Sequence, residues 1–475
     1  PKHYKRLKKV LLCVGFLVVV FLLGALLSSP IVNASKYQQL LTVQNREFTD
    51  DIKQISYDEI PILDSDSAAL LGNRKMGSMA DMVSQFEVGN TYTQINYHNS
   101  PVRVAPLQYA DPIKWLTNQS NGIPAYILID MATQDTELVK LDQPIKYSES
   151  EYFNRNIYRH LRFRYPTYIF DDINFELDEN GTPWWVCPVK GFSIGLFGGQ
   201  TVDRVVLCNA QTGECQDMSV NDVPQWVDRV YSSSLLVSYY NYYGTLKHGF
   251  LNSVFGQKDC LKTTDGYNYL ALDDDVWLYT GVTSVTGDQS IVGFVLMNQR
   301  TGETHFYSVQ GAVESSAMSS AEGQVQNLGY KATFPLLLNT ANQPTYFIAL
   351  KDNSGLVKKY AMVNVQKYQI VAIGDTVAEC EKKYGTLMAQ NGSAGGTVST
   401  ANDKKITGTI RKMAQSVLEG NSHYYLLLDS SSSLFDVPVS QDLDVLRYSE
   451  GDRITLTYTP PADGSSDGVC TVQEL

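Results

Sequence analysis

The stretch VLMNQRTGETHFYSV, from Val295 to Val309, contains two apolar runs separated by Asn298 and a Thr-Gly-Glu turn. The pattern returns in three other places, LIDMATQDTELVKL (128–141), VLCNAQTGECQDM (206–218) and ALKDNSGLVKKYAMV (349–363). An Asn or Asp side chain bonds backbone N–H groups ahead of it, and glycine in three of the four stretches tolerates a positive φ. Each stretch is therefore predicted to be a β-hairpin, and the repetition predicts several similar antiparallel sheets.

Two further patterns accompany the hairpins. A turn and a proline precede an aromatic strand three times, in NGIPAYILI (121–129), NGTPWWVCP (180–188) and NQPTYFIAL (342–350). Apolar residues at helical spacing come before the strands, in residues 65–86, 148–163 and 312–329. A proline that opens a strand needs no ladder partner. We therefore expect a β-rich α+β fold, built of repeated units in which a helix covers an antiparallel meander.

A helix followed by strands with a D-x-x-T-G-E-like turn resembles the PepSY-type domains, which are small extracytoplasmic modules of bacteria. Over longer stretches the chain also resembles membrane-anchored Gram-positive exoproteins of unassigned role. The resemblance implies a location outside the cytoplasm. It also implies a link to the control of envelope peptidases, but no activity or site residue that can be carried over to this chain.

Residues 10–29 form a long apolar segment, in which Val10 to Leu27 are eighteen residues without a charge. About 20 such residues cross a bilayer as a helix. Five cations in KHYKRLKK precede the segment, so the positive-inside rule predicts a transmembrane anchor with a cytoplasmic N-terminus and with residues 35–475 outside. A signal peptide cleaved before Ser35 is the alternative, although the segment exceeds the usual apolar length of about 7–15 residues.

Charge separates the two sides of this segment. The first 34 residues hold five Lys or Arg and no acid, and the remainder carries 33 basic and 50 acidic residues, a formal charge of −17. An acidic exterior disfavours binding to nucleic acid. We therefore expect no nucleic acid among the partners.

The C-terminal part begins after a small, polar stretch, AQNGSAGGTVSTANDK, which reads as a linker. The strands that follow resemble an OB-fold, with I-x-G-x-I first and L-x-x-x-x-x-G-D-x-I-x-L-x-Y later, from Leu446 to Tyr458. OB barrels bind oligonucleotides or oligosaccharides or act as adaptors. Since nucleic acid is disfavoured here, we expect an adaptor that contacts protein.

These boundaries divide the chain into six parts. They are a cytoplasmic tip and anchor or signal peptide (1–34), a first α+β module (35–147), one or more central α+β modules (148–310), a third module (311–388), a linker (389–404) and an OB-like β-barrel (405–475).

Six cysteines lie beyond the apolar segment. In CNAQTGEC the predicted hairpin places Cys208 and Cys215 on facing arms, which makes them a disulfide candidate. Two unpaired thiols are the alternative. The cysteine spacing matches no zinc pattern and no histidine lies near in sequence, so we do not expect a metal there.

Acidic and aromatic clusters are the remaining site candidates. Asp273, Asp274 and Asp275 are weak calcium candidates, and an acidic turn is the plainer interpretation. Binding-surface candidates are Trp184 and Trp185 together with Tyr239, Tyr240, Tyr242 and Tyr243. For the tyrosines, packing against neighbouring sheets is the favoured alternative to a sugar-binding platform.

We found no S-x-x-K, H-E-x-x-H, Walker loop or G-x-G-x-x-G, so we expect neither catalysis nor a cofactor. The leading interpretation is a single-pass, membrane-anchored extracytoplasmic scaffold that acts by contact with another envelope protein. One alternative is a cell-surface receptor for carbohydrate or peptide, which requires Trp184, Trp185, Trp226 and Trp277 to line an open groove. A regulator of an envelope enzyme is the other.

Overall fold

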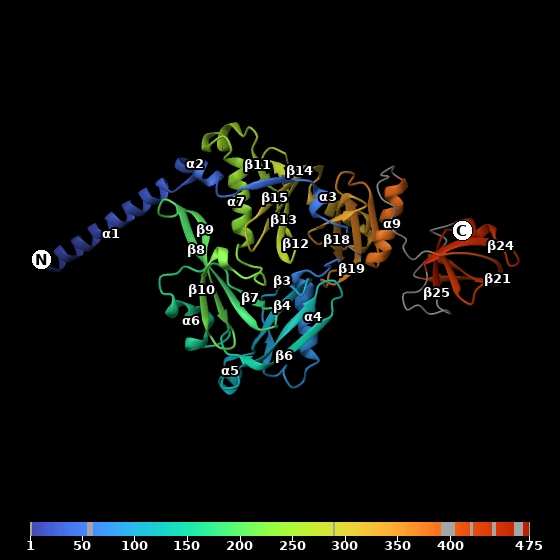
Figure 1. The fold of residues 1–475 in the computed structure, drawn as a ribbon, viewed down its shortest axis with the longest axis horizontal. Coiled ribbons are helices and arrows are strands. Elements are labelled where there is room, and N and C mark those ends of the chain that lie inside the picture. The colour runs from blue at the N-terminus through green and yellow to red at the C-terminus, as the bar shows by residue number, and fades with distance from the viewer. Residues whose placement is uncertain are drawn as a thin grey trace. The chain divides into compact units, whose positions relative to one another are not determined.

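The computed structural model describes residues 2–54, 60–287, 290–390, 404–418, 421–438, 443–459 and 469–474. The chain divides into two compact units, Pro1–Ala394 and Gly395–Leu475 (Figure 1). The predicted linker, 389–404, falls mostly on residues outside the described ranges.

Nine α-helices occur in the described part of the chain, all in the first unit. They are α1 (Lys2–Leu27), α2 (Pro30–Gln38), α3 (Phe48–Asp51), α4 (Ser65–Gly77), α5 (Pro112–Asn118), α6 (Ile157–Arg164), α7 (Ser233–Thr245), α8 (Glu314–Gln324) and α9 (Val377–Gln390). Side-chain caps start several of them: the Asp64 carboxylate accepts from the Ser67 N–H at 2.9 Å, and Asn156 accepts from the Arg159 N–H at 3.3 Å.

Four sheets make up the body of the first unit. Sheet 1 contains β2 (Phe86–Val88), β3 (Thr93–Tyr97), β4 (Ser100–Tyr109), β5 (Ile123–Asp130) and β6 (Thr136–Ile145). Sheet 2 contains β7 (Asn174–Leu177), β8 (Pro183–Ile194), β9 (Gly198–Asn209) and β10 (Cys215–Ser219). Sheet 3 contains β1 (Val43–Arg46), β11 (Leu261–Thr263), β12 (Asn268–Leu272), β13 (Asp275–Ser284), β14 (Ser290–Asn298) and β15 (Thr304–Ala312). Sheet 4 contains β16 (Lys331–Ala332), β17 (Leu336–Thr340), β18 (Gln343–Lys351), β19 (Val357–Asn364) and β20 (Val371–Gly374).

The sheets are almost wholly antiparallel. Their strand orders are β2-β4-β5-β6, β10-β9-β8-β7, β1-β15-β14-β13-β11 and β16-β18-β19-β20, with β3, β12 and β17 pairing beside β4, β13 and β18. The early strand β1 is the exception, because it pairs in parallel with β15. The expected β-rich α+β fold is therefore confirmed, and the predicted central region, 148–310, holds two sheets.

The repeated turn forms as the sequence predicts. The Asn298 side-chain oxygen accepts from the N–H groups of Arg300 and Thr301 at 2.8 and 2.9 Å, and Gly302 has a φ of 76°. Asp130 and Asn209 make equivalent pairs of bonds in two other hairpins, and in the fourth Asp352 accepts from the N–H groups two and four residues ahead. One local code, an Asx side chain followed by a left-handed residue, thus closes a hairpin in each of the four sheets.

Sheets 2 and 3 bury both of their faces. Along β8, Trp185 and Cys187 belong to the core shared with sheet 1, whereas Val186 belongs to the core that contains α7. Along β13, Leu278 faces the α7 core and Tyr279 faces the core shared with sheet 4. Because side chains alternate along a strand, burial on both sides produces the continuous apolar runs seen in the sequence. Figure 1 shows the four sheets arranged around a common centre.

The C-terminal unit is a five-stranded closed sheet. Its strands are β21 (Lys404–Leu418), β22 (Asn421–Leu428), β23 (Leu434–Pro438), β24 (Arg453–Thr459) and β25 (Val469–Glu474). They pair in the order β21-β22-β23-β25-β24, and β24 pairs back onto β21. The core of this unit includes Leu426, Phe435 and Leu456, all fully buried.

Helix α1 contains the expected apolar segment. Arg6–Leu27 is 22 residues long and apolar enough to cross a membrane, and almost all of it is exposed on the protein. The length and composition of this helix fit a membrane anchor.

Candidate functional site

An open groove lies where the end of β4 meets the segment before α6. Its volume is about 420 Å³, which falls in the range of small-molecule and peptide side-chain sites. The groove is lined by Tyr109, Ala110, Asp111, Pro112, Glu149, Ser150, Glu151, Tyr152, Phe153, Asn156 and Arg159.

Local sequence signals hold both walls of the groove in place. On one side, Asp111 accepts hydrogen bonds from the N–H groups of Ile113 and Lys114 at 2.8 and 2.9 Å, and Pro112 opens helix α5. On the other side, Asn156 caps α6. Two short helices therefore start at opposite rims.

A buried carboxylate forms the floor. Glu151 is 2% exposed, and its two oxygens accept from the Tyr109 hydroxyl at 2.7 Å and the Trp115 indole N–H at 2.8 Å. Burial and the bond to Glu151 both raise the pKa of Tyr109, so the phenol stays protonated and remains a donor. The floor is thus a satisfied hydrogen-bond network that fixes the positions of two aromatic rings.

Aromatic side chains form an exposed wall. Tyr152 is 44% and Phe153 66% exposed, and their rings lie 4.6 and 6.0 Å from that of Trp115. Phe153 has a φ of 55°, a conformation that costs roughly 1–2 kcal/mol for an L-residue. Such strain is retained where the surrounding structure fixes it, and strained residues cluster at binding sites.

The charges around the groove are mainly negative. Asp111, Glu149 and Glu151 contribute carboxylates and Arg159 contributes the one cation of the lining. Glu149 accepts from the Tyr158 hydroxyl at 2.5 Å. The combination of exposed aromatic rings and surplus carboxylates suits a ligand that is both apolar and cationic.

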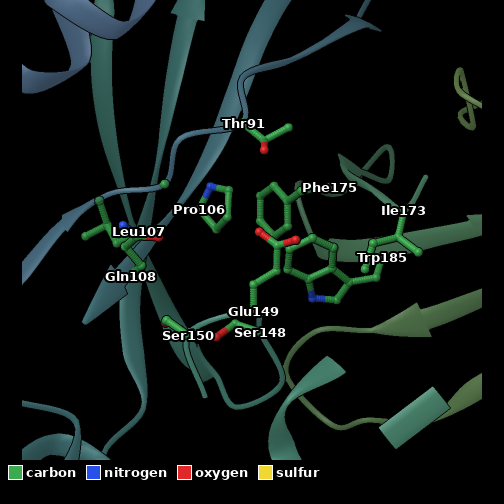
Figure 2. Close-up of a pocket in the computed structure, with 11 residues that line it drawn as sticks. Thr91, Pro106, Leu107, Gln108, Ser148, Glu149, Ser150, Ile173, Phe175 and Trp185 are labelled. Carbon is green, nitrogen blue, oxygen red and sulfur yellow. Dashed lines mark hydrogen bonds between the residues drawn. The ribbon is translucent and has the colours of Figure 1, made fainter. Parts of the chain in front are cut away.

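A second cavity lies nearby, between sheets 1 and 2 (Figure 2). Its volume of about 20 Å³ is enough for one water molecule. It is bordered by Thr91, Pro106, Phe175 and Trp185 among others. This cavity is therefore a packing space between sheets and too small for an organic ligand.

Buried charges tie the sheets together near their common centre. The Glu176 carboxylate of β7 accepts from the backbone N–H groups of Asp228 and Arg229 at 2.8 and 3.0 Å. Asp228 in turn accepts from the Asn96 N–H of β3 at 2.7 Å. The Arg229 guanidinium lies 4.2 Å from the ring centre of Tyr269 in β12. Burial raises the pKa of Glu176 to about 7 and also raises that of Asp228, which the Glu176 charge raises further. This group joins sheets 1, 2 and 3.

The calcium candidates occupy the tight turn between β12 and β13. Asp273 and Asp274 have φ values of 50° and 63°, which is the backbone of a two-residue hairpin turn. Asp275 is buried and receives two bonds from the Arg300 guanidinium, at 2.7 and 2.9 Å, and one from Asn298. An Arg-paired carboxylate has little capacity left for a cation, so calcium binding here stays a prediction that the geometry does not favour.

Most of the predicted aromatic surface is interior. Trp185, Tyr239 and Tyr240 are buried in the cores around sheet 2, so for them the surface prediction is wrong. Tyr242 and Tyr243 are half-buried and pack against other tyrosines. The physical reason is that both faces of sheet 2 are covered, which leaves its rings no solvent side.

The tryptophans of the receptor hypothesis are buried or half-buried. Trp277 is buried and donates to the Leu272 carbonyl at 3.2 Å. Trp184 and Trp226 are half-buried with ring centres 5.9 Å apart, and Trp184 donates to Asp178. None of them lines the groove described above.

The disulfide candidate residues face each other, as expected. Cys208 and Cys215 are paired in register across β9 and β10, and their Sγ atoms are 3.1 Å apart. A disulfide requires about 2.05 Å, so among the described residues both are thiols. The bond itself stays a prediction. The fold also brings His160 beside them, 48 residues before Cys208, which no spacing in the sequence indicated.

These three side chains place ligand atoms within 4.8 Å of one another, a spacing that brings a zinc site to mind only if the donor geometry also fits. Two thiolates on one tetrahedral zinc, at about 2.3 Å each, lie about 3.8 Å apart, and the two Sγ atoms are closer. His160 Nε2 lies 2.8 Å from the Gly213 carbonyl oxygen and therefore carries a proton. The set does not fit a metal.

The end of α1 is fixed to the β8–β9 hairpin. The buried Ser28 hydroxyl oxygen accepts from the N–H groups of Leu196 and Phe197 at 2.9 and 3.2 Å. The Tyr37 hydroxyl donates to the Ser28 carbonyl at 2.7 Å and accepts from the Gly199 N–H at 3.1 Å. These bonds define a joint between the apolar helix and sheet 2.

Comparison with known proteins identifies no family for this chain. No protein-family model matches the sequence, and no curated protein matches it. Among solved structures, a mutant of Synechocystis apocarotenoid oxygenase is 9% identical, with 64% of this chain and 62% of that chain covered and a TM-score of 0.18. A cobalt-substituted form of the same oxygenase is 7% identical, with coverages of 62% and 48% and a TM-score of 0.14. A B. megaterium levansucrase mutant is 9% identical, with coverages of 94% and 97% and a TM-score of 0.18. The chain spans about half the length of the first oxygenase chains it matches. Likeness at these scores carries no argument about fold or activity.

Proposed function

We propose that this protein is a single-pass, membrane-anchored extracytoplasmic scaffold that holds a protein partner in the groove between α5 and α6. The observation that carries the proposal is the exposed, strained Phe153 beside surplus carboxylates. A groove of this volume with an aromatic wall is the default form of a ligand site. The partner segment is an extended peptide that combines Arg or Lys with aliphatic residues.

Contacts at the joint support the anchoring part of the proposal. Phe21 of α1 lies 5.3 Å, between ring centres, from Phe197 at the tip of the β8–β9 hairpin. Leu196 beside it is exposed. Phe21 precedes the end of α1 by six residues, or about 9 Å of helix, so the hairpin tip enters the membrane when α1 spans it. Leu251 and Phe255, which follow α7, are also exposed apolar residues, and the neighbouring Phe250 packs against the cluster of Tyr37 and Ile194 at the joint.

The groove is well separated from the joint. Helix α5 lies on the far side of the body from α2 (Figure 1). In the proposed orientation, with the cations of the N-terminus in the cytoplasm, the groove opens away from the membrane surface. That position suits capture of another envelope protein.

The C-terminal unit gives second support for an adaptor role. Its strand order, with β23 and β25 parallel, supports the proposed OB-like barrel. We propose it as a further protein-contact module. The relation of the helix-plus-meander units to PepSY modules stays a proposal as well, and nothing favours the carbohydrate receptor.

Peptide selection tests the groove directly. The full chain in lipid nanodiscs is screened against a random peptide library, and selected peptides are titrated against Phe153→Ser and, as a matched control, Phe163→Ser. Phe163 is equally exposed on α6 but outside the groove. We expect basic, aliphatic peptides whose affinity falls about tenfold or more in Phe153→Ser and is unchanged in the control, since losing one anchor residue costs over about 1.4 kcal/mol. Acidic peptides, or equal binding by both variants, would contradict the proposal.

A reporter enzyme tests the anchor separately. A phosphatase that folds only outside the cytoplasm is fused after Leu475. We expect this fusion to be active in intact cells. A second fusion carries a reporter that is active only in the cytoplasm, and activity of that fusion alone would contradict the proposed orientation.

A further inference from the structure

The β9–β10 hairpin holds two thiols in a geometry suited to bond formation. The Asn209 N–H donates to the Glu214 carbonyl at 2.9 Å, so the next pair along, Cys208 and Cys215, is a non-hydrogen-bonded pair. Such pairs have Cα atoms about 4.5 Å apart, inside the range that a disulfide requires. Closing the 3.1 Å gap between the Sγ atoms thus needs only a small side-chain rotation.

A histidine from another element points at this pair. His160 of α6 packs its ring 4.6 Å from that of Tyr147 and donates from Nε2 to the Gly213 carbonyl in the hairpin turn at 2.8 Å. The same Nε2 lies 3.6 Å from the Cys215 Sγ. Since a carbonyl only accepts, this nitrogen carries its proton, and it presents that proton to Cys215 as well.

The two cysteines are not equivalent. Cys208 is fully buried, whereas Cys215 is partly exposed. Hydrogen bonding from the Cys208 thiol, and then from His160, lowers the pKa of Cys215, while the same bond and burial raise that of Cys208. Arg164 lowers the pKa of Cys215 further. The other titratable groups that face the pair are Cys187, Tyr147 and Tyr165.

We propose that Cys208 and Cys215 form a thiol–disulfide exchange site for small external disulfides, in which Cys215 attacks, Cys208 resolves and His160 positions the Cys215 thiolate. In the first step the Cys215 thiolate displaces one thiolate, RS⁻, from RSSR and forms the mixed disulfide Cys215–S–SR. In the second step Cys208, on giving up its proton to solvent, attacks the Cys215 sulfur and displaces the second RS⁻. The external disulfide is reduced to two thiols, and the two cysteines are oxidised to one disulfide.

The proposal is independent of the groove and of the anchor. Failure of the exchange reaction leaves peptide binding untouched, and failure of peptide binding leaves the thiols untouched. The same chemistry runs backwards, so an oxidised pair would accept electrons from small thiols.

The experiment uses the full chain in detergent micelles and 5,5′-dithiobis(2-nitrobenzoate), a disulfide that releases one coloured thiolate per exchange. The amount of thiolate released by a Cys208→Ser/Cys215→Ser double variant is subtracted from that of the native chain, which removes the contribution of the other cysteines. We expect two rapid equivalents from the pair, and peptide mass mapping that shows loss of two hydrogens across Cys208 and Cys215 with no adduct on either. A single equivalent with a lasting adduct on the native pair would overturn the proposal.

Single variants assign the roles. Cys208→Ser is expected to release one equivalent at the native rate and to keep the adduct on Cys215. Cys215→Ser is expected to react at least about tenfold more slowly, because the remaining thiol is buried and un-ionised. Equal rates for the two single variants would contradict the order of attack.

His160→Phe tests the positioning residue, since it keeps a ring against Tyr147 and removes the N–H. The first release should slow about tenfold near pH 6, because one unit of thiol pKa changes the thiolate fraction tenfold. It should recover near pH 9, where the thiol ionises without help. A pH profile identical to that of the native chain would show that His160 has no role in the exchange. Far-ultraviolet circular dichroism of each variant confirms that the sheets are retained.

Discussion

The hairpins β5–β6 and β9–β10 share one turn and differ in almost everything attached to it. In both, an Asx side chain accepts two backbone N–H groups, from Ala132 and Thr133 in the first and from Gln211 and Thr212 in the second. The left-handed position is Gln134 in the first, with a φ of 64°, and Gly213 in the second, with a φ of 74°.

The pairs that flank the two turns also differ. Ile129 faces Thr136 in the first hairpin, and Cys208 faces Cys215 at the equivalent place in the second. The second turn also receives His160 on the Gly213 carbonyl. The repeated turn therefore determines only the backbone conformation of each hairpin. We attribute thiol reactivity to the second hairpin alone, because there a cysteine pair flanks the turn and His160 contacts it.

The largest expected change in stability comes from a substitution in the tightly packed turn of the β9–β10 hairpin. A Cβ added at Gly213 would lie 2.3 Å from the Tyr147 ring, whereas one at Gly302 in the β14–β15 hairpin would meet only Tyr231, at 3.5 Å. Both positions are left-handed. Gly213→Ala should lower the free energy of unfolding by about 3 kcal/mol, combining strain and overlap, and Gly302→Ala by about 1 kcal/mol. Urea titration measures both free energies of unfolding. Equal losses in the two variants would mean that the Tyr147 ring moves aside at no cost in stability.

The two hairpins belong to sheets that meet at Glu176 and Asp228, and a pH effect is expected there. Burial raises the pKa of Glu176 to about 7. The folded state thus favours the protonated carboxyl, so this contribution to stability is fully present below about pH 4.5 and is lost as the pH rises to about 7, a change of up to about 3 kcal/mol.

Asp228→Asn should flatten that dependence, because it removes a second buried carboxyl, whose pKa is raised by burial and by the Glu176 charge and whose contribution to stability is therefore also lost as the pH rises. Thermal melting from pH 5 to pH 8 measures the slope, with Asp135→Asn on an exposed turn as the control. An unchanged slope in Asp228→Asn would place the titrating group elsewhere.

The smallest expected change in stability comes from Gln134, the left-handed residue in the turn of the β5–β6 hairpin. Gln134→Gly relieves the left-handed strain, worth about 1–2 kcal/mol, but raises the entropy of the unfolded chain by about 0.4–1 kcal/mol and loses the contact of Gln134 with Tyr360. A net stabilisation of about 0.5 kcal/mol is expected in the same urea titration. A lower stability would show that the glutamine side chain contributes more than the strain costs.

Local signals account for what the sequence predicted well. The Asx oxygen and the left-handed residue act within five positions of each other, so the hairpins follow from residues such as Asn298 and Gly302 alone. The facing of Cys208 and Cys215 follows from the same register. The apolar helix near the N-terminus is likewise a property of one continuous stretch.

Tertiary contacts account for what was missed. His160 reaches Gly213 only because α6 packs on sheet 2, and Glu151 becomes a groove floor only because Tyr109 and Trp115 converge on it from two other elements. The same limit explains the misplaced aromatic surface, since burial of both faces of sheet 2 depends on its neighbours. The Asp275–Arg300 pair joins residues 25 positions apart and competes with the predicted cation site.

Grafting the thiol pair onto the first hairpin tests the central claim that reactivity comes from the contact and not from the repeat. Ile129→Cys/Thr136→Cys, made in the Cys208→Ser/Cys215→Ser background, recreates a buried and a half-exposed thiol in the same register, without a histidine. The account predicts that at pH 6 this pair releases coloured thiolate at least about tenfold more slowly than the native pair. Equal rates from the two hairpins would show that the turn alone makes the site and that His160 adds nothing.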